Sequence, residues 1–322
     1  MRVVGILAVI AGHTLGTPLV RPLMYTWHVP LFFILAGFFW SPQRPFAVEL
    51  GKRSRTLLLP YAVWFVLIAV PFLILDPLLE STTWQRLFLP VWNGQQSAMP
   101  YTTFWFISVL FVCCVLLRLL WRAPRYAVWA VAVLAAGAGW MFGPQLAQTP
   151  FSIGSALPCL IYLMLGWEGH RLHDRLITPQ RLRPAALISL VALGVVVGSV
   201  ALGVSRPVDI KQGDYGTPLV STISAVVIAS TLVLVAEWVF TRLPRRASLI
   251  ATVLACCGFM VVLVHPFVLW LMRHFAPPAP DWFVFAICAL VPWTAALIVV
   301  RTRLAAWLTG ATRWRRAVED PA

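Results

Sequence analysis

Residues 2–13 read RVVGILAVIAGH, an apolar run with an arginine at one end and a histidine at the other. Arg2 and His13 are eleven positions apart, which is close to three turns of an α-helix. On a helix they lie on nearly one face, about 16 Å apart along the axis. If this helix enters a bilayer at Arg2, His13 lies near mid-membrane, where an ionisable side chain is expensive and usually functional. A structural histidine bonded to a neighbouring helix is the alternative.

The composition indicates that most of this chain lies in a membrane rather than in water. Apolar residues make up 60% and charged residues 11% of it, and the mean hydropathy is +0.84. Soluble domains carry about a quarter charged residues. We therefore predict an all-α, polytopic integral membrane protein with about ten transmembrane helices. Charged or Pro/Gly-rich breaks separate the apolar segments, which we place at 3–20, 24–40, 57–75, 103–120, 126–143, 151–167, 185–204, 218–238, 249–272 and 282–300.

The basic residues predict the orientation. With the N-terminus inside, the inner segments hold 20 of the 25 Lys+Arg and six acids, whereas the outer segments hold five bases and five acids. The positive-inside rule then places both termini in the cytoplasm, with the chain in the inner (plasma) membrane. The basic excess is spread over every inner loop, which argues against nucleic acid as a partner and for membrane lipids. We predict one transmembrane domain over 1–300 and a basic cytoplasmic tail over 301–322.

A second histidine lies near the start of the next segment, where residues 26–39 read TWHVPLFFILAGFF. His28 follows His13 by fifteen positions, across a short connection. We therefore predict that the two histidines lie on adjacent antiparallel helices, at depths that differ by roughly 8 Å. Two histidines so placed can line one polar cavity. The alternative for His28 is an interfacial histidine beside Trp27 in the aromatic belt.

A cluster of bases precedes the third segment, where residues 52–61 read KRSRTLLLPY. Arg53 and Arg55 lie at the same predicted membrane level as Arg2, one hairpin away. Converging guanidinium groups match the oxygens of a phosphate, so these arginines are candidates for a phosphate site. Charge that serves only orientation is the alternative. The six cysteines all fall inside predicted segments without metal-ligand spacing, so we expect no metal.

These motifs together resemble the acyltransferase family 3 membrane proteins. The resemblance rests on Arg-x10-His in the first segment, HVPLFFILAGFF at 28–39 and Arg-x-Arg before LLLPY at 57–61. The wording GHT at 12–14 and HVPLFF at 28–33 is most similar to the fucose 4-O-acetylase-like branch. Later pieces agree, namely FWFI at 104–107, Leu165-Gly166 and LVHP at 263–266. One departure is the missing acidic residue before Arg2, which bears on where the native chain starts more than on the family.

The resemblance implies transfer of an acyl group, usually acetyl from acetyl-CoA or another acyl-CoA, to a hydroxyl of a carbohydrate or glycolipid. Arg2, Arg53 and Arg55 would then hold the phosphates of coenzyme A, whose extended arm is comparable to the roughly 16 Å from Arg2 to His13. His13 would act as the general base or carry the acyl group briefly. On the acceptor side the resemblance implies three substrate-binding residues, His28, Trp105 and His265.

His265 is followed by Pro266, so a break in the helix could expose backbone to an outer cavity. A structural kink is the alternative to an acceptor role. For the whole chain, one rival function is a transporter of a lipid, sugar or drug with His13 and His28 as a proton relay. Few acids lie within the predicted spans, which counts against a proton-coupled carrier. A glycosyltransferase that uses a lipid-linked sugar is a third function, and it would need a carboxylate base in an outer loop.

Overall fold

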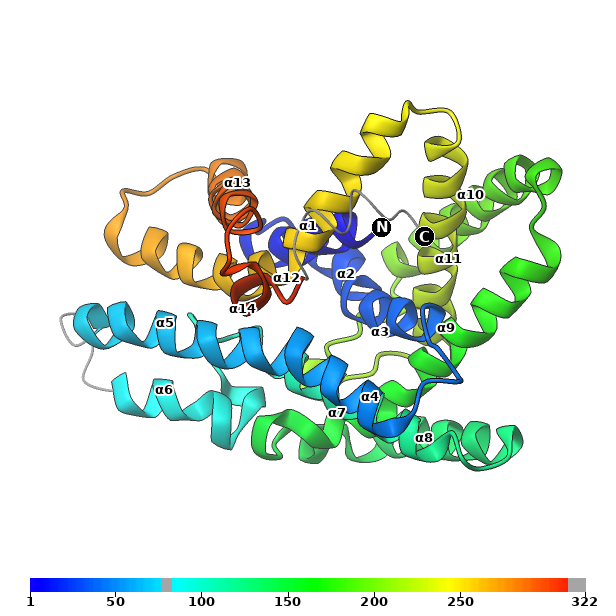
Figure 1. The fold of residues 1–322 in the computed structure, drawn as a ribbon, viewed down its shortest axis with the longest axis horizontal. Helices are drawn as coiled ribbons and strands as arrows, with labels where there is room; N and C mark the ends of the chain where they lie inside the picture. The colour runs from blue at the N-terminus through cyan, green and yellow to red at the C-terminus, as the bar shows by residue number, and fades with distance from the viewer. Residues whose placement is uncertain (77–82, 312–322) are drawn as a thin grey trace.

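The computed structural model describes residues 1–76 and 83–311, and these residues form helices joined by loops, without a β-strand (Figure 1). The all-helical prediction is confirmed. The α-helices are α1 Arg2–Thr14, α2 Val20–Tyr25, α3 His28–Phe38, α4 Phe46–Arg53, α5 Leu59–Leu75, α6 Thr83–Trp92, α7 Phe104–Leu120, α8 Arg125–Ala147, α9 Ala156–Leu176, α10 Pro179–Ala201, α11 Val220–Phe240, α12 Arg245–Phe275, α13 Asp281–Val299 and α14 Ala305–Thr309. Shorter turns are η1 Ser54–Leu58, which is π-helical, and the 3₁₀ turns η3 Gly94–Gln96, η4 Pro150–Ser155 and η5 Ile210–Gln212.

Seven helices in the described part of the chain are long and apolar enough to cross a membrane. They are Phe46–Leu75, Arg125–Ala147, Pro150–Leu176, Pro179–Ala201, Val220–Phe240, Arg245–Phe275 and Asp281–Val299. Each of the ten predicted segments contains a helix, but α1, α3 and α7 have 13, 11 and 17 residues. At 1.5 Å per residue even α7 extends only about 25 Å, less than the roughly 30 Å hydrocarbon core. The count of ten full spans therefore stays a prediction.

The second predicted segment, 24–40, is broken in the structure. Its helix α3 begins at His28, and Trp27 before it has a non-helical backbone, with φ −139° and ψ −22°. Pro30 lies in the first turn of α3, where its missing N–H costs little. The break places His28 at the N-terminus of a short helix.

Helix α6 has no counterpart among the ten predicted segments. Its sequence, TWQRLFLPVW, is only ten residues long and carries a charge, so it lacks the signature of a span. Trp84, Phe88 and Trp92 are spaced four residues apart and are 63%, 60% and 75% exposed. They form an apolar stripe on one face of the helix, a pattern typical of helices that lie in the membrane interface.

The connectors between helices meet at two ends of the bundle. At the first, which we call the loop end, Gln95 Nε2 donates to the Gln212 carbonyl at 3.0 Å and Arg273 contacts Met99. The loop end comprises the connectors 15–19, 93–103, 202–219 and 276–280. These are connectors that the sequence assigned to the outer side.

We call the second end the arginine end. There Arg118 donates to the Ser41 carbonyl at 2.6 Å, Arg125 pairs with Glu168, and His173 contacts Glu237 at 2.7 Å. The arginine end comprises the connectors 39–45, 121–124, 177–178 and 241–244. The structure thus sorts the connectors into the two sets that the sequence predicted. Which set faces the cytoplasm stays a prediction.

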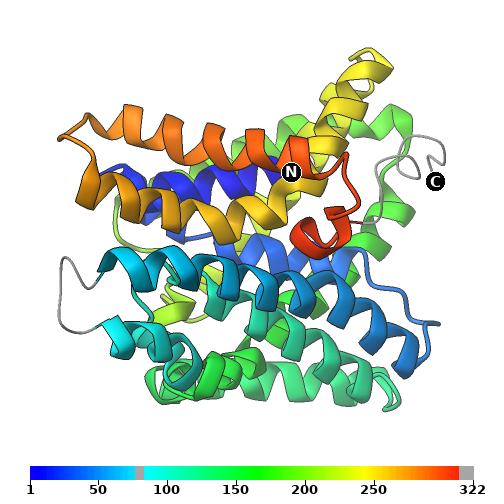
Figure 2. The same cartoon turned by 60° about the vertical axis from the view of Figure 1, so that its left-hand side comes forward.

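Helix α1 runs alongside α12 and α13 (Figure 2) and also packs on α2 and α3. Two glycines allow this close packing. A Cβ on Gly12 would lie 3.0 Å from the ring of Tyr25, and one on Gly258 would lie 2.3 Å from Ile6 Cδ1. The chain segment that carries Arg2 and His13 is therefore fixed against neighbours on both sides.

Helix α3, which carries His28, is held against α9 by another glycine pair. A Cβ on Gly37 would collide with the backbone of Leu163, and one on Gly166 would collide with the backbone of Ile34. Because both positions admit only glycine at this separation, the two helices approach backbone to backbone. This gives a structural reason for Gly166, which the sequence singled out only as a family feature.

The helix break at Pro266, which the sequence left as one possibility beside a structural kink, is not present in the structure. Helix α12 continues through Pro266 from Arg245 to Phe275. A proline inside a helix frees the carbonyl four residues earlier, here that of Val262. Thr103 Oγ1, at the start of α7, donates to this carbonyl at 2.8 Å. The helix stays whole because a hydroxyl from another helix replaces the missing N–H.

The predicted tail, 301–322, is described only as far as residue 311. Helix α14 lies in this part and packs against α5, where Trp64 Nε1 donates to the Leu308 carbonyl at 2.8 Å. Residues 312–322, with the remaining basic residues of the predicted tail, lie outside the described residues.

Candidate active site

A cavity of about 220 Å³ lies at the loop end of α1. Its walls come from α1, α2, α3, the start of α7, α12 and the 202–219 connector. The structure brings three of the predicted site residues, His13, His28 and Trp105, into this wall. The lining also includes Val9, one turn from His13 toward Arg2, so the cavity reaches to about 10 Å from Arg2 along the helix.

His13 occupies the last turn of α1 and is partly buried. The end of this helix is fixed from two sides. Arg273 Nη2 donates to the His13 carbonyl at 3.2 Å, and the Gly16 amide donates to Asp281 Oδ2 at 2.8 Å. Both bonds use backbone groups at or just beyond the end of the helix. The His13 imidazole takes no part in them and lines the cavity.

His28 is 4% exposed and lies on the same cavity as His13, as the sequence predicted. Its Nδ1 lies 2.7 Å from the carbonyl oxygen of Met24. A carbonyl only accepts, so Nδ1 carries the proton and, in the neutral ring, Nε2 carries a lone pair. The ring of Tyr25 packs edge-on against His28 with centroids 4.7 Å apart. His28 is therefore a fixed hydrogen-bond acceptor in the wall.

His265 lies behind His13 rather than in the cavity wall. The ring is fully buried, and the centroids of the two imidazoles are 5.6 Å apart. Its Nδ1 donates to the Val261 carbonyl at 3.0 Å, so its Nε2 is an acceptor. That Nε2 has no hydrogen-bond partner among the described residues. A buried acceptor without a donor is costly, and the nearest ring that can supply an N–H is that of His13.

Trp105 closes the cavity on the α7 side and is 6% exposed. It lies in the first turn of α7, next to Thr103, whose hydroxyl holds the Val262 carbonyl. Ser108 Oγ donates to the Trp105 carbonyl at 2.9 Å and so stabilises this first turn. A flat indole in a rigid turn gives this wall an apolar face.

Sequence reasoning missed the polar residues that the 202–219 connector adds to the cavity. Asp209 and Lys211 both line it, with Arg21 from α2. Lys211 Nζ donates to the Ser97 carbonyl at 2.5 Å and to Thr102 Oγ1 at 2.7 Å. The sequence carries a signal for this wall, because apolar Val208 and Ile210 alternate with Asp209 and Lys211. Val208 and Ile210 are each 1% exposed, so they anchor the connector in the protein interior.

At the arginine end, the Arg2 guanidinium lies 5.8 Å from the centroid of the Phe39 ring, in the connector that also carries Arg44. Arg53 Nε donates to Glu49 Oε1 at 2.7 Å, and Arg44 pairs with the same carboxylate at 2.5 Å. Glu49 is 1% exposed, so it is a buried acid held between two arginines, and the sequence analysis did not single it out. Arg55 is exposed on the π-helical turn η1. Such turns interrupt α-helices mostly at functional sites.

A family model described as an acyltransferase domain (Acyl_transf_3) matches residues 1–301. The chain belongs to this acyltransferase family. The resemblance drawn from its first sixty residues is therefore confirmed over nearly the whole chain. The acyltransferase domain as matched ends at residue 301, close to the predicted boundary at 300.

One relative of this acyltransferase is the nodulation protein NolL of Mesorhizobium japonicum, which is 30% identical over 155 residues. The match covers 45% of the chain and 39% of NolL, so the chain spans well under half the length of that relative. No solved structure matches the chain.

An acyltransferase needs an acyl donor and an acceptor, and the two candidate regions lie at opposite ends of α1. Arg2, Arg53 and Arg55 belong to the arginine end, whereas His13, His28 and Trp105 line the cavity. Within the described residues, no group of three or more His, Cys, Asp or Glu side chains could hold a metal ion.

Proposed function

We propose that this acyltransferase is a membrane O-acetyltransferase that moves an acetyl group from cytoplasmic acetyl-CoA to a hydroxyl of a carbohydrate or glycolipid. The observation that carries the proposal is the position of His13. It lines the cavity, and it belongs to the helix whose other end carries Arg2 at the arginine end. One residue of each group, Arg2 for the donor and His13 for the acceptor, thus lies on the same helix, about 16 Å apart along its axis.

In the proposed reaction, His13 is the general base. It takes the proton of the acceptor hydroxyl while the hydroxyl oxygen attacks the carbonyl carbon of the thioester. The carbon–sulfur bond then breaks, and His13 returns the proton to the departing sulfur. The products are the acetyl ester and coenzyme A, and His13 is regenerated.

His265 supports this role as a positioning residue. Its Nε2 is a buried lone pair next to the His13 ring, so a His13 N–H directed at it would satisfy both groups. The other His13 nitrogen would then carry the lone pair that a base needs. The role replaces the acceptor contact that the sequence suggested for His265.

The donor's phosphates are assigned to Arg2, Arg53 and Arg55. Guanidinium groups bind phosphate oxygens in pairs, and Glu49 holds Arg53 at the position where this would occur. The acceptor is assigned to the cavity, with its hydroxyl near His13, a hydrogen bond to Nε2 of His28 and a ring face against Trp105.

The test is release of the coenzyme A thiol by the purified protein, with acetyl-CoA as donor and p-nitrophenyl glycosides as acceptor probes. We expect His13→Ala to lower the turnover by about 10²–10⁴-fold, the usual contribution of a general base. His274→Ala is the matched control, because His274 is an exposed histidine at the end of α12. Turnover of His13→Ala within about twofold of the wild type would refute the base assignment. A carrier would consume no thioester in either form.

A further inference from the structure

Lys211 is a cation in the cavity wall whose polar contacts are neutral. Its ammonium donates to the Ser97 carbonyl and to the Thr102 hydroxyl, at 2.5 and 2.7 Å. An ammonium group has three N–H donors, so these bonds leave one. Among the described residues, no carboxylate lies within 4.0 Å of Lys211, the range in which ion pairs form.

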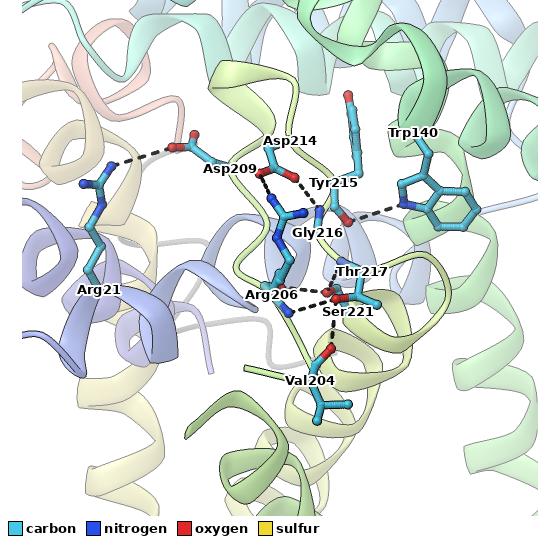
Figure 3. Close-up of polar contacts among 10 residues, drawn as sticks. All are labelled: Arg21, Trp140, Val204, Arg206, Asp209, Asp214, Tyr215, Gly216, Thr217 and Ser221. Carbon is cyan, nitrogen blue, oxygen red and sulfur yellow. Dashed lines mark hydrogen bonds and ion pairs between the residues drawn. The ribbon is translucent and has the colours of Figure 1, made fainter. Parts of the chain in front are cut away.

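The nearby acid of the same connector forms its ion pair with a different cation. Asp209 lies two residues away, but its carboxylate is directed to Arg21, with 3.9 Å between Oδ2 and Nη2 (Figure 3). A second cation, Arg273, donates to the His13 carbonyl from the other side of that residue. The cavity lining itself holds two cations, Arg21 and Lys211, and one acid, Asp209.

The connector that carries Lys211 is folded rather than loose (Figure 3). Arg206 pairs with Asp214 at 3.1 Å, and the Ser221 hydroxyl donates to the Arg206 carbonyl at 2.7 Å. Trp140 of α8 reaches the Tyr215 carbonyl at 3.4 Å. These contacts on both sides of residues 208–212 hold the ammonium at a fixed place in the wall. A cation positioned in this way is suited to recognise a ligand.

We propose that Lys211 forms an anion-binding subsite, and that the acceptor carries a carboxylate or phosphate group close to the hydroxyl that receives the acetyl group. The inference rests on the proposed function, since it names the class of its acceptor. An anion at Lys211 would use the remaining N–H and neutralise the excess charge of the cavity. A charge-assisted hydrogen bond of about 1.5–3 kcal/mol corresponds to roughly 10–150-fold in affinity.

The chain offers an internal control for a binding test, because its only two lysines are Lys52 at the arginine end and Lys211. Burial lowers the pKa of the Lys211 ammonium to about 8, so its amine reacts with acylating reagents near neutral pH. The detergent-purified protein is labelled with N-hydroxysulfosuccinimide acetate, and both lysines are quantified by mass spectrometry. The ligand probes are methyl β-D-glucuronoside and the neutral methyl β-D-glucoside at equal concentration and ionic strength.

We expect the glucuronoside to slow labelling of Lys211 by about tenfold and to leave Lys52 unchanged, while the glucoside changes neither. Equal protection by both sugars, or by neither, would overturn the subsite. Adenosine 3′,5′-bisphosphate is a third probe, which carries donor-like phosphates. Protection of Lys211 by this probe alone would assign the anion to the donor and overturn the acceptor proposal.

Turnover gives a second readout. With p-nitrophenyl β-D-glucuronide and p-nitrophenyl β-D-glucoside as acceptors, the wild type should favour the glucuronide in kcat/KM. Lys211→Met should abolish this preference by lowering kcat/KM for the glucuronide more than for the glucoside, and Lys211→Arg should preserve the preference. Equal loss with both acceptors in Lys211→Met would contradict a subsite. Because labelling needs no turnover, its result is independent of whether the proposed reaction is correct.

Discussion

The buried carboxylate of the arginine end has two charged partners, whereas the Lys211 ammonium in the cavity wall contacts only neutral oxygens. At the arginine end Glu49 lies between Arg44 and Arg53, and Glu237 contacts His173. At the cavity, His265 Nε2 has no partner among the described residues, and the contacts of Lys211 are to neutral oxygens. A buried polar group without a partner costs folding free energy, and a bound ligand is one way to satisfy it. This difference supports the proposal that the chemistry takes place at the cavity.

The largest effect that would sharpen this comparison is on donor binding at the arginine end. We expect Arg2→Ala and Arg53→Ala each to raise the KM for acetyl-CoA by roughly 10–150-fold with little change in kcat, because each removes a charge-assisted contact of about 1.5–3 kcal/mol. Arg55→Ala should act in the same direction. Arg122→Ala, an exposed arginine of a connector at the same end, is the control. An unchanged KM for acetyl-CoA in all three variants would show that these arginines serve only to orient the protein in the membrane.

The next effect concerns pH and separates Lys211 from the histidines. The ammonium of Lys211, with a pKa of about 8, is charged below that pH and neutral above it. The kcat/KM ratio of the glucuronide to the glucoside should be constant below about pH 7 and fall by up to about tenfold per pH unit above pH 8. Other ionisable or charged groups that line the same cavity are His13, Arg21, Tyr25, His28 and Asp209.

Taking the ratio removes the common titration of His13, since both acceptors need the same base. Burial raises the pKa of the Asp209 carboxyl, and the Lys211→Arg variant keeps Asp209, so the comparison of this variant with the wild type separates the two titrations. Lys211→Arg should hold the ratio constant through pH 9. A wild-type ratio that stays flat from pH 6 to 9 would contradict a role for the Lys211 charge.

A smaller effect tests the His265 contact. His265→Leu removes the Nε2 acceptor, and we expect kcat to fall by about 3–10-fold, the value of one hydrogen bond, with the KM for both substrates nearly unchanged. The acid limb of the pH profile of kcat should shift, because the His13 ring loses the hydrogen-bond acceptor beside it. His265→Gln, which keeps an acceptor on a side chain of similar reach, should recover part of the rate and the original limb. A loss of rate with no shift of the limb would make His265 a packing residue only.

The smallest effect is on stability. Thr103→Ala removes the hydroxyl that serves the Val262 carbonyl beneath Pro266, and the unfolding free energy should fall by about 1–3 kcal/mol. Thr103→Ser keeps the hydroxyl and is the control. Thermal unfolding in detergent gives the comparison, and equal melting temperatures for the alanine and serine variants would show that this bond does not support α12.

Sequence reasoning reached the all-helical class, the two sets of connectors and the shared cavity of His13 and His28. These follow from hydropathy, charge and short connections, which are local properties of the chain. It failed where the partner lies far along the chain. The continuity of α12 through Pro266 depends on Thr103, and the polar wall depends on how the 202–219 connector folds back to Ser97. Helix α6 was missed because an amphipathic helix of ten residues carries no signature of a span.

The central claim is that one transfer uses both ends of the bundle, with the donor bound at the arginine end and the acceptor in the cavity at the loop end. The direct measurement uses sealed vesicles, whose orientation is read by labelling Lys52 or Lys211 with an impermeant amine reagent. Labelled acetyl-CoA supplied only on the Lys52 side should acetylate p-nitrophenyl β-D-glucuronide supplied only on the Lys211 side. Transfer that occurs only when both substrates are on the Lys52 side would contradict the claim.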